Sequence, residues 1–568
     1  MYKLNKLTLR DIFVQSCITY ADRPALGMVD DSIVLKYGEL GGLGAILAAR
    51  LKACGMGKTD KIVLLSENRP EWGLVYFTVA ASGMVVVPIL TDFNPEQIRN
   101  IIAHSEAKAV VVSEKLLSKL DAYKGMIINI EELASPLLLA EAYKSFGAIE
   151  NFSKNFREDR DHAIKMLESA FPFVNEDDLA AILYTSGTTG NSKGVMLSHK
   201  NLVSNVMASR SIIKLRRTDK LLSILPMAHT YECTLGFINS IAQGSSSWYL
   251  DKPPVASVLL PALKKIRPSI MLSVPLVIEK VYRASVVPSL QKISLYKHDF
   301  LKPLFHRIAG KKLYKTFGGR LRFFGVGGSA LAPDVEAFLA DAHFPYAIGY
   351  GLTETSPLIA GSAPFKTKLR STGPALKGVE LRISEPRPDN GEGEIQARGP
   401  NIMLGYYKDN DKTAETFTED GWFKTGDLGI FDQKGRLFIK GRLKTMILGA
   451  AGENIYPEEI EALINKSSVV AESLVLGEGA GLTALVQLKE EVLSDLKAKA
   501  KDSVEDFERS IEDLLEFVRK EANSGLAAFS RITKMVRHKD AFEKTPTQKI
   551  KRFLYTATGL RKTSGIKP

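Results

Sequence analysis

Residues 180–194 read AAILYTSGTTGNSKG, an apolar run that leads into a loop of glycine, serine and threonine with a lysine near its end. Small residues let backbone N–H groups approach a ligand closely, hydroxyls add hydrogen-bond donors, and the lysine adds positive charge. A strand followed by such a loop predicts a site for phosphate oxygens rather than a flexible turn. The spacing differs from the Walker A pattern, because Gly187 and Gly190 are separated by two residues and Lys193 is followed by Gly194. A P-loop kinase or NTPase is therefore disfavoured.

Short apolar runs alternate with longer stretches of helical character on both sides of this loop. KIVLLS (61–66), AKAVVVS (107–113), KLLSILP (220–226) and LRFFGVGG (321–328) have strand length and are bounded by charge, glycine, proline or serine. The alternation predicts an α/β fold with layered, largely parallel sheets covered on both faces. From about Gly378 the short strands VELRI, GEIQARG and GRLFIKGR predict a β-rich subdomain.

The length of 568 residues exceeds what one ordinary core holds, so two or more domains are expected. The best boundary is the short charged stretch from Gly441 to Lys444. It divides the chain into a large N-terminal domain, residues 1–441, and a small α+β domain, residues 442–568. In the small domain the sequence predicts two strands, a long charged helix over 493–521 and a basic tail.

Further motifs follow the phosphate loop: GYGLTETSP (349–357), WFKTGDLG (422–429) and KTPTQKIKR (544–552). With the loop, they resemble the adenylate-forming superfamily of acyl- and aryl-CoA synthetases, adenylation domains and luciferases, over essentially the whole chain. LPMAHTYE (225–232) and VPLVIEKVY (274–282) are most similar to the long-chain fatty acyl-CoA synthetase branch. The resemblance implies an acid–thiol ligase, in which ATP activates a fatty acid to an acyl-adenylate with release of pyrophosphate and coenzyme A then takes the acyl group.

The resemblance also implies roles for single residues around ATP and the acid. Tyr350 would stack on the adenine, Asp427 would accept the ribose hydroxyls, and Mg²⁺ would be held by Thr185 and Glu354, since hard oxygen ligands suit this ion. His229 would orient the substrate carboxylate or gate its tunnel. The phosphate-binding set is Thr185, Ser186, Gly187, Thr188, Thr189, Gly190 and Lys193, and the adenine- and ribose-binding set is Gly328, Ser329, Tyr350, Gly351, Thr353, Asp427 and Arg442.

In the small domain the resemblance selects Lys549 to bridge the attacking carboxylate and the α-phosphate, so that Lys549, Lys193 and His229 form the catalytic set. The family often has glycine before this lysine, whereas this chain has Gln548. Lys444 would be the hinge about which the small domain rotates between the two half-reactions. The rotation would remove Lys549 and present a loop that lines the coenzyme A tunnel, through Gly449, Gly452, Glu453 and Asn454.

The three cysteines, Cys17, Cys54 and Cys233, lie far apart and form neither a metal nor a disulfide motif, which favours reduced cysteines in the cytoplasm. The N-terminus lacks the apolar core and cleavage site of a signal peptide. The longest uncharged run, residues 73–90, is interrupted by Gly83 and predicts a buried helix followed by a buried strand, not a membrane span.

The net charge of +12 is unevenly distributed. Residues 280–322 contain eleven basic side chains and one acid, Asp299. A solvated helical face is the default interpretation, and contact with an anionic membrane surface or a polyanionic ligand is the alternative. Nucleic acid is disfavoured because no nucleic-acid module accompanies the charge. The sequence thus leaves open a peripheral membrane contact and a homodimer.

Two other functions compete with a coenzyme A ligase. An enzyme that passes the acyl group to an acyl carrier protein would keep every adenylation motif, and segment 280–322 could dock such an acidic partner. A non-catalytic nucleotide-binding scaffold would require a broken site, whereas Lys193, Glu354, Asp427 and Lys549 are all present. The sequence does not decide the acceptor or the acyl chain length.

Overall fold

The computed structural model describes residues 4–555 except 122, 136–137, 139–157, 187–191, 449–452, 479–480, 501–502 and 546–549. Of the residues predicted for the site, Gly187, Thr188, Thr189, Gly190, Gly449, Gly452 and Lys549 lie outside the described residues, as does the side chain of Ser186.

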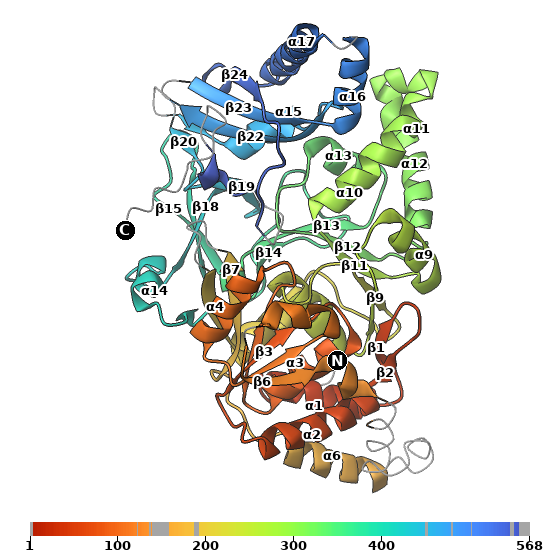
Figure 1. Ribbon diagram of the computed structural model, residues 1–568, viewed down its shortest axis with the longest axis vertical. Helices are drawn as coiled ribbons and strands as arrows, with labels where there is room; N and C mark the ends of the chain where they lie inside the picture. Colours follow the sequence, from red (N-terminus) through yellow and green to blue (C-terminus); the bar gives the residue numbers. More distant parts are fainter. Residues whose placement is uncertain are drawn as a thin grey trace.

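A seven-stranded sheet contains the two strands on either side of residues 187–191 (Figure 1). Five of its strands are mutually parallel, β8 pairs antiparallel with β7, and β17 pairs antiparallel with β8 at the edge of the sheet. Uninterrupted valine and isoleucine runs suit strands covered on both faces. In spatial order the strands are β17 (Gly405–Tyr406), β8 (Ser192–Ser198), β7 (Leu179–Ser186), β4 (Val85–Pro88), β3 (Lys61–Leu65), β5 (Ala109–Val112) and β6 (Met126–Asn129).

A second, eight-stranded sheet is parallel except at its two edge strands, β14 and β2. The strands expected at 61–66, 107–113, 180–186, 220–226 and 321–328 are confirmed in these two sheets. In spatial order the second sheet contains β14 (Leu358–Gly361), β13 (Tyr346–Gly351), β12 (Phe323–Val326), β11 (Ile270–Ser273), β9 (Lys220–Ser223), β10 (Ser246–Tyr249), β1 (Pro24–Met28) and β2 (Val34–Lys36).

Helix α3 (Pro70–Ala81) lies between the two sheets, and every one of its residues is buried. Its Gly73 leaves no room for a side chain, because a Cβ there would lie 2.7 Å from Phe237 and 2.8 Å from Leu26 of β1. At Gly83 the backbone turns with φ +76° into β4, which confirms the buried helix and strand expected at 73–90. Among the described residues, no helix is long and apolar enough to cross a membrane.

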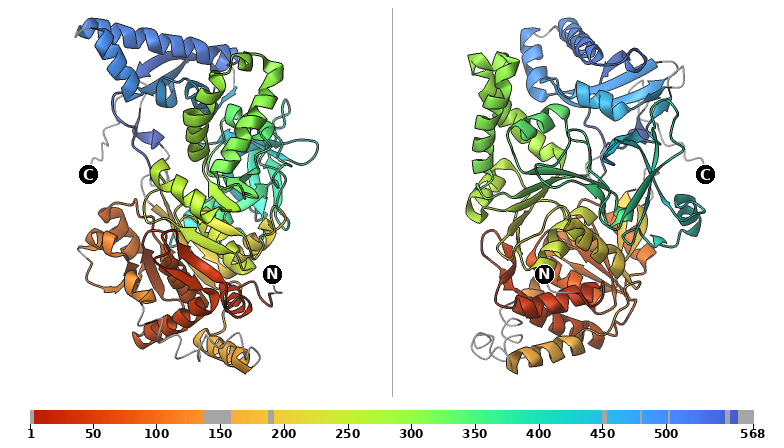
Figure 2. Two further views of the ribbon diagram at one scale, coloured as in Figure 1. Left: turned by 90° about the vertical axis from the view of Figure 1, so that its right-hand side faces the viewer. Right: turned by 180° about the vertical axis from the view of Figure 1, so that it is seen from behind.

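The remaining helices pack against the sheets and one another, and some of them are almost wholly buried (Figures 1 and 2). In the large part of the chain they are α1 (Leu9–Thr19), α2 (Tyr37–Ala53), α4 (Pro95–Ser105), α6 (Glu158–Ala170), α7 (His199–Ser209), the π-helical turn η4 (Tyr231–Ile238), α8 (Asn239–Gln243), α9 (Ala256–Ile266), α10 (Pro275–Val281), the π-helical turn η5 (Tyr282–Val286), α11 (Val287–Gln291), α12 (Lys302–Thr316), α13 (Pro333–Asp341) and α14 (Asn410–Thr416).

The β-rich part after Gly378 is an antiparallel sheet of β15 (Glu380–Ser384), β16 (Gly393–Arg398), β18 (Phe423–Phe431) and β19 (Leu437–Arg442). Beyond it, the short hairpin of β20 (Ile447–Leu448) and β21 (Asn454–Ile455) leads into a C-terminal lobe. The lobe has a hydrophobic core of its own, and is drawn in blue at the top of Figure 1. It contains β22 (Val470–Glu478), β23 (Gly481–Leu488), β24 (Ile532–Arg537), α15 (Pro457–Ile464), α16 (Glu490–Lys499) and α17 (Val504–Ser524).

The single long helix expected over 493–521 is wrong, because two helices occupy this stretch. Ser503 is the N-cap of α17, and its hydroxyl accepts a hydrogen bond from the Asp506 N–H at 3.2 Å. A serine cap satisfies a free donor at a helix start, so it favours a new helix over continuation of the old one. Strand β24 lies in the stretch that the sequence analysis assigned to a basic tail, and it pairs in parallel with β23.

Candidate active site

The phosphate loop is flanked by two antiparallel strands. In the register of β7 and β8, Thr185 is opposite Lys193 and Ser186 is opposite Ser192, so the ends of the loop are held together by strand pairing. Lys193 is therefore a strand residue with a fixed direction, although the sequence analysis treated it as part of the loop. It is half-buried, and its position is set by the sheet.

Lys193 and Glu354 meet at Tyr406, a residue of β17. The Lys193 Nζ lies 5.2 Å from the centroid of the Tyr406 ring, and the Tyr406 hydroxyl donates to Glu354 Oε1 at 2.9 Å. Burial, together with the charges of Lys412 and Lys444, lowers the pKa of Lys193, and Glu354 and Asp409 oppose this effect. Three lysines thus act on one another here, and an anion would relieve their repulsion.

Tyr406 belongs to none of the motifs that indicate the site in the sequence. Its position beside Lys193 arises because β17 pairs with β8, with Tyr406 opposite Val195. This pairing joins segments about two hundred residues apart, so no local pattern predicts it. The only sequence signal is the adjacent pair of tyrosines that follows Gly405.

Glu354 lies in the single turn η8 (Thr353–Thr355), directly after β13. The turn is tight because Gly351 approaches the next strand closely, and a Cβ at this position would lie 1.8 Å from the Pro357 carbonyl oxygen. The Glu354 carbonyl accepts from the Met403 N–H at 2.9 Å, which joins η8 to the segment before β17. Gly351, Thr353 and Glu354 are all half-buried, consistent with a ligand-facing position.

The donor set of Glu354 and Thr185 fits Mg²⁺ bound mainly through substrate phosphates. The Tyr406 hydroxyl fixes one oxygen of the Glu354 carboxylate, and Thr185 lies on the strand edge opposite Lys193. No group of three or more His, Cys, Asp or Glu side chains that could hold a metal occurs in the described part of the chain. An all-protein cage is not required, because Mg²⁺ commonly uses one or two carboxylates plus phosphate and water.

Asp427 is the centre of a second cluster. Its side chain is buried, and it accepts from the Tyr350 hydroxyl at 2.7 Å through Oδ2 and pairs with Arg442 Nε at 3.0 Å through Oδ1. Arg442 is opposite Asp427 in the register of β18 and β19. The structure therefore brings together three residues that the sequence analysis assigned to adenine and ribose. Burial and the Asp427 carboxylate raise the pKa of Tyr350, so its hydroxyl remains a donor.

Gly328 and Ser329 lie exposed in the loop that follows β12. Gly328 has φ +92°, a backbone conformation that favours glycine, and a Cβ there would approach Val274 at 3.6 Å. The neighbouring Gly327 faces the ring of Tyr231, since a Cβ at Gly327 would lie 3.3 Å from that ring. The loop of the adenine-binding set therefore lies close to the π-helical turn η4.

His229 is half-buried just before η4. Its Nδ1 accepts a hydrogen bond from the Tyr231 N–H at 3.2 Å, so the ring caps the start of the turn. Its carbonyl accepts from the Cys233 N–H at 2.9 Å. The position of His229 is thus coupled to that of Tyr231.

A narrow apolar cleft with a cavity volume of about 40 Å³ lies beside Tyr231. It passes between η4, helix α7 and strands β11 to β14, and most of its lining is aliphatic. Such a lining suits an acyl chain better than a charged substrate. The lining residues are Ser209, Ile212, Ile213, Leu215, Tyr231, Leu235, Asn239, Ile270, Leu272, Phe323, Gly325, Ala347, Ile348, Gly349, Leu358 and Ser362.

The C-terminal lobe contacts the β-rich sheet through residues near Lys444. The Asn454 Nδ2 donates to the buried Glu392 Oε1 at 2.8 Å, and Tyr456 packs so close to Gly441 that a Cβ there would lie 2.3 Å from the Tyr456 ring. Lys444 is exposed, and Glu453 is half-buried at the start of β21. Of the predicted loop 449–454, the structure thus describes Glu453 and Asn454.

The two sides of the segment that contains Lys549 are anchored on the C-terminal lobe. Lys544 forms an ion pair with Glu472 at 2.9 Å and a β-bridge with Ile550. Arg552 pairs with the buried Glu461 and donates to the Val475 carbonyl at 3.3 Å. Burial raises the pKa of Glu461 to about 7, and Arg552 opposes this shift. The described residues on either side of 546–549 are therefore fixed on the lobe.

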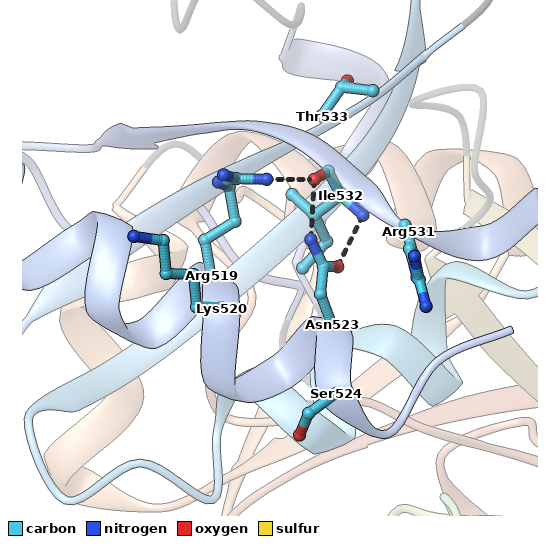
Figure 3. Close-up of a pocket in the computed structure, with 7 residues that line it drawn as sticks. All are labelled: Arg519, Lys520, Asn523, Ser524, Arg531, Ile532 and Thr533. Carbon is cyan, nitrogen blue, oxygen red and sulfur yellow. Dashed lines mark hydrogen bonds between the residues drawn. The ribbon is translucent and has the colours of Figure 1, made fainter. Parts of the chain in front are cut away.

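A larger polar pocket in the C-terminal lobe contains none of the predicted site residues (Figure 3). Its central contacts are structural: the Asn523 Nδ2 donates to the Ile532 carbonyl at 3.0 Å, and the Ile532 N–H donates to Asn523 Oδ1 at 2.8 Å. Arg519 donates to the same carbonyl at 3.1 Å. These bonds fix the start of β24 on α17, so this pocket is not assigned a ligand.

Comparison with known proteins identifies the family. The family model of the AMP-binding enzyme matches residues 13–407, and that of the AMP-binding enzyme C-terminal domain matches residues 444–557. The chain belongs to the AMP-binding enzyme family. This family match, together with the named relatives, confirms the resemblance to adenylate-forming enzymes close to long-chain fatty acid–CoA ligases, and the α/β fold with a large and a smaller C-terminal part is confirmed as well.

Two relatives and one solved structure illustrate the similarity. A peroxisomal long chain acyl-CoA synthetase 6 of Arabidopsis thaliana is 30% identical over 541 residues, which cover 86% of this chain and 74% of the relative. A chloroplastic long-chain-fatty-acid–[acyl-carrier-protein] ligase of the same plant is 28% identical, with 82% and 74% covered. ATP-bound MatB from Rhodopseudomonas palustris has a TM-score of 0.71 at 25% identity, with 96% and 97% covered.

Glu232, a residue that the sequence analysis did not single out, is buried in η4 beside the cleft. Its side chain folds back over its own turn, because a Cβ at Gly236 would lie 2.7 Å from Glu232 Oε1. Burial raises the pKa of Glu232 from 4.5 to about 8, and the nearby Ser223 hydroxyl opposes this shift. Burial also raises the pKa of Cys233 to about 12, so this neighbour is neutral. Glu232 is therefore protonated at neutral pH.

A raised pKa in the folded state gives Glu232→Gln a testable effect. The folded protein holds the Glu232 proton more tightly than the unfolded chain, so stability falls as pH rises from about 4.5 to about 8. Glutamine does not titrate, so the variant lacks this loss. Its free energy of unfolding relative to that of the original protein should therefore rise by about 2–4 kcal/mol from pH 5 to pH 8. Urea unfolding of both proteins at several pH values measures the difference. A difference in unfolding free energy that does not change with pH would contradict a neutral Glu232. The control is Glu380→Gln, which alters an exposed glutamate.

Proposed function

We propose that this ligase converts a long-chain fatty acid and ATP to an acyl-adenylate and pyrophosphate, and then transfers the acyl group to coenzyme A. The observation that carries the proposal is the pair of clusters Lys193–Tyr406–Glu354 and Tyr350–Asp427–Arg442. They would supply cations and hydrogen-bond acceptors to the phosphates and to the ribose of ATP. The apolar cleft that begins at Tyr231 supports a hydrophobic acid. The names of the relatives support the same class of substrate.

In the first half-reaction a carboxylate oxygen of the acid attacks the α-phosphorus of ATP, and the bond to pyrophosphate breaks. Carboxylate, phosphates and the transition state are all negative, so the enzyme must hold positive groups in fixed positions. We assign this task to Lys193, the loop residues 185–190 and Lys549. Asp427 and Arg442 would position the ribose, and Tyr350 with Gly328, Ser329, Gly351 and Thr353 would contact the adenine. His229 would orient the acid at the mouth of the cleft.

Mg²⁺ would lie between Glu354, Thr185 and the ATP phosphates. When bound, the ion neutralises phosphate charge and orients the leaving pyrophosphate. Tyr406 keeps the Glu354 carboxylate in place for this role, since its hydroxyl binds one of the two carboxylate oxygens. The low exposure of Lys193 strengthens its attraction to phosphate, because the charge is only partly screened by water.

In the second half-reaction the thiol of coenzyme A attacks the acyl carbon and AMP leaves. We propose two domains, residues 1–441 and 442–568, that rotate about Lys444 between the two steps. The separate hydrophobic core of the C-terminal lobe and the boundary between the two family matches support this division. Gly449, Gly452, Glu453 and Asn454 would then line the path of the pantetheine arm.

An acyl carrier protein is the alternative acceptor, and similarity to a long-chain-fatty-acid–[acyl-carrier-protein] ligase is the observation that favours it. The proposal also includes a peripheral contact of basic segment 280–322 with an anionic membrane, a cytoplasmic location at that membrane, and self-association as a homodimer. The three free cysteines, two of them buried, support a reducing location.

The proposed reaction predicts which product ATP gives. With MgATP and a panel of acids from acetate to oleate, pyrophosphate release should be largest with long chains, and a thioester should form only when coenzyme A is added. Malachite green after pyrophosphatase treatment, with mass spectrometry of the thioester, measures both. Release of ADP would exclude the adenylate route, and transfer to an acyl carrier protein alone would select the alternative acceptor.

Asp427→Ala should chiefly raise the KM for ATP, because the variant loses the carboxylate that would bind the ribose and leaves Arg442 unpaired. The effect on kcat/KM should be on the order of 10²-fold, and Tyr350→Phe should cost less, since it removes only one hydroxyl. Initial rates of pyrophosphate release against ATP concentration test this. Asp420→Asn, which alters an exposed carboxylate paired with Arg382, is the matched control. Equal KM values for Asp427→Ala and this control would show that the site is misassigned.

Lys549 and Lys444 should separate the two half-reactions. Lys549→Ala should lower adenylation by on the order of 10²–10³-fold, since it removes a well-placed charge, and should spare thioester formation from preformed acyl-adenylate. Lys444→Pro should do the reverse, because a fixed φ restricts hinge rotation. Lys444→Ala is the control for charge, as Lys444 lies within electrostatic reach of Lys193. Equal damage to both steps in folded Lys549→Ala protein would refute the alternation.

A further inference from the structure

The helices of segment 280–322 form an edge of the molecule with a fixed outer face (Figures 1 and 2). Helix α12 is fixed in its rotation by its inner side, where His306 Nδ1 bonds to Asp341 Oδ2 at 2.8 Å and its Nε2 bonds to the Tyr296 hydroxyl at 3.0 Å. Gly310 packs closely against the end of α13, because a Cβ at position 310 would lie 2.4 Å from the Cβ of Ala342, the residue that follows this helix. The opposite side of α12 must therefore face solvent.

The first part of this outer face is apolar. Phe300 is 81% exposed, Ile308 is 59% exposed and Leu304 is 54% exposed. The three residues are four positions apart, so they lie on the same side of α12 and of the turn that precedes it. Leu295, in the 3₁₀ turn Ser294–Lys297, is also more than half exposed. Single exposed apolar residues are common on protein surfaces, but an aligned group of this kind indicates a contact with another phase or molecule.

The second part of the same face is basic. Arg307, Lys311, Lys312 and Lys315 are exposed, and they follow or flank the apolar group along α12. The only acid of the segment, Asp299, is already paired with Lys302 at 2.6 Å. Within the described part of the chain, no carboxylate forms an ion pair with these four residues. Their positive charge is consequently available to an external anion.

We propose that this α12 surface, made of Phe300, Leu304, Arg307, Ile308, Lys311, Lys312 and Lys315, binds an anionic phospholipid bilayer, with Phe300, Leu304 and Ile308 inserted among the acyl chains. Charge complementarity favours this occupant, because an apolar stripe flanked by lysine and arginine matches the layers of an anionic interface. A second copy of the chain would place the same basic side chains against one another across a two-fold axis.

The insertion goes beyond the electrostatic contact expected from the charge of segment 280–322. Electrostatic attraction weakens as salt screens it, whereas insertion of apolar side chains persists. The consequence that the enzyme draws its acid from the bilayer rests on the proposed function, but the binding itself does not.

The test is co-flotation of the full chain with vesicles of phosphatidylcholine alone or with about 30% phosphatidylglycerol, a proportion that gives a strongly negative surface. The original protein should bind the anionic vesicles and retain part of this binding in high salt. The triple variant Phe300→Ser, Leu304→Ser, Ile308→Ser should bind about tenfold less at every salt concentration. The triple variant Lys311→Glu, Lys312→Glu, Lys315→Glu should lose about tenfold or more at low salt only.

The matched control is Phe365→Ser with Phe517→Ser, which removes two equally exposed phenylalanines outside the α12 surface and should leave binding unchanged. Pyrophosphate release with a short, water-soluble acid should be the same in all variants, so that loss of activity is distinguishable from loss of binding. The proposal is overturned if the serine triple variant floats with the anionic vesicles as well as the original protein does. It is also overturned if, without vesicles, the original protein sediments as a dimer and the serine triple variant does not, because the surface would then join two copies.

Discussion

The pairing of β7, β8 and β17 is the constraint on which the candidate site depends. The hairpin of β7 and β8 sets Thr185 opposite Lys193, and β17 adds Tyr406 from a distant part of the sequence. Through Tyr406, the sheet edge also fixes Glu354, which comes from a turn on the other large sheet. A one-residue shift in this register would turn Lys193 to the opposite face. Strand pairing thus takes the place of a rigid loop in holding the charges.

A strand register also holds the second cluster, where Asp427 and Arg442 are directly opposite one another. The two clusters differ in their chemistry. Around Lys193, burial and the charges of Lys412 and Lys444 lower the pKa of the lysine although Glu354 and Asp409 oppose this shift, so an anion would be favoured there. Around Asp427 the carboxylate has partners at both oxygens and is buried, so it is held in one orientation for neutral hydroxyl groups. One end of the site suits phosphate and the other suits a ribose.

The sequence predicted the parts of the fold and site that local patterns encode. Valine-rich runs such as 107–113 became buried strands because β-branched residues and burial act in the same direction. Tyr406 could not be predicted, since its place depends on pairing across about two hundred residues, and Glu232 could not, because a glutamate is ordinarily exposed. The single helix expected over 493–521 was wrong because Ser503 caps a second helix, α17. The roles of the site residues, Lys549 included, stay predictions.

The contacts of the C-terminal lobe differ in strength in a way that suits rotation. Toward the β-rich sheet, Tyr456 packs against Gly441 and Asn454 donates to the Glu392 carboxylate, a bond whose net contribution is about 1.5–3 kcal/mol. Within the lobe, Arg552 and the buried Glu461 form a charged pair, and losing either partner of such a pair costs about 3–5 kcal/mol. The described residues that follow 546–549 are therefore tied firmly to the lobe, while the lobe is tied less firmly to the sheet. Rotation about Lys444 would then carry these flanking residues with the lobe.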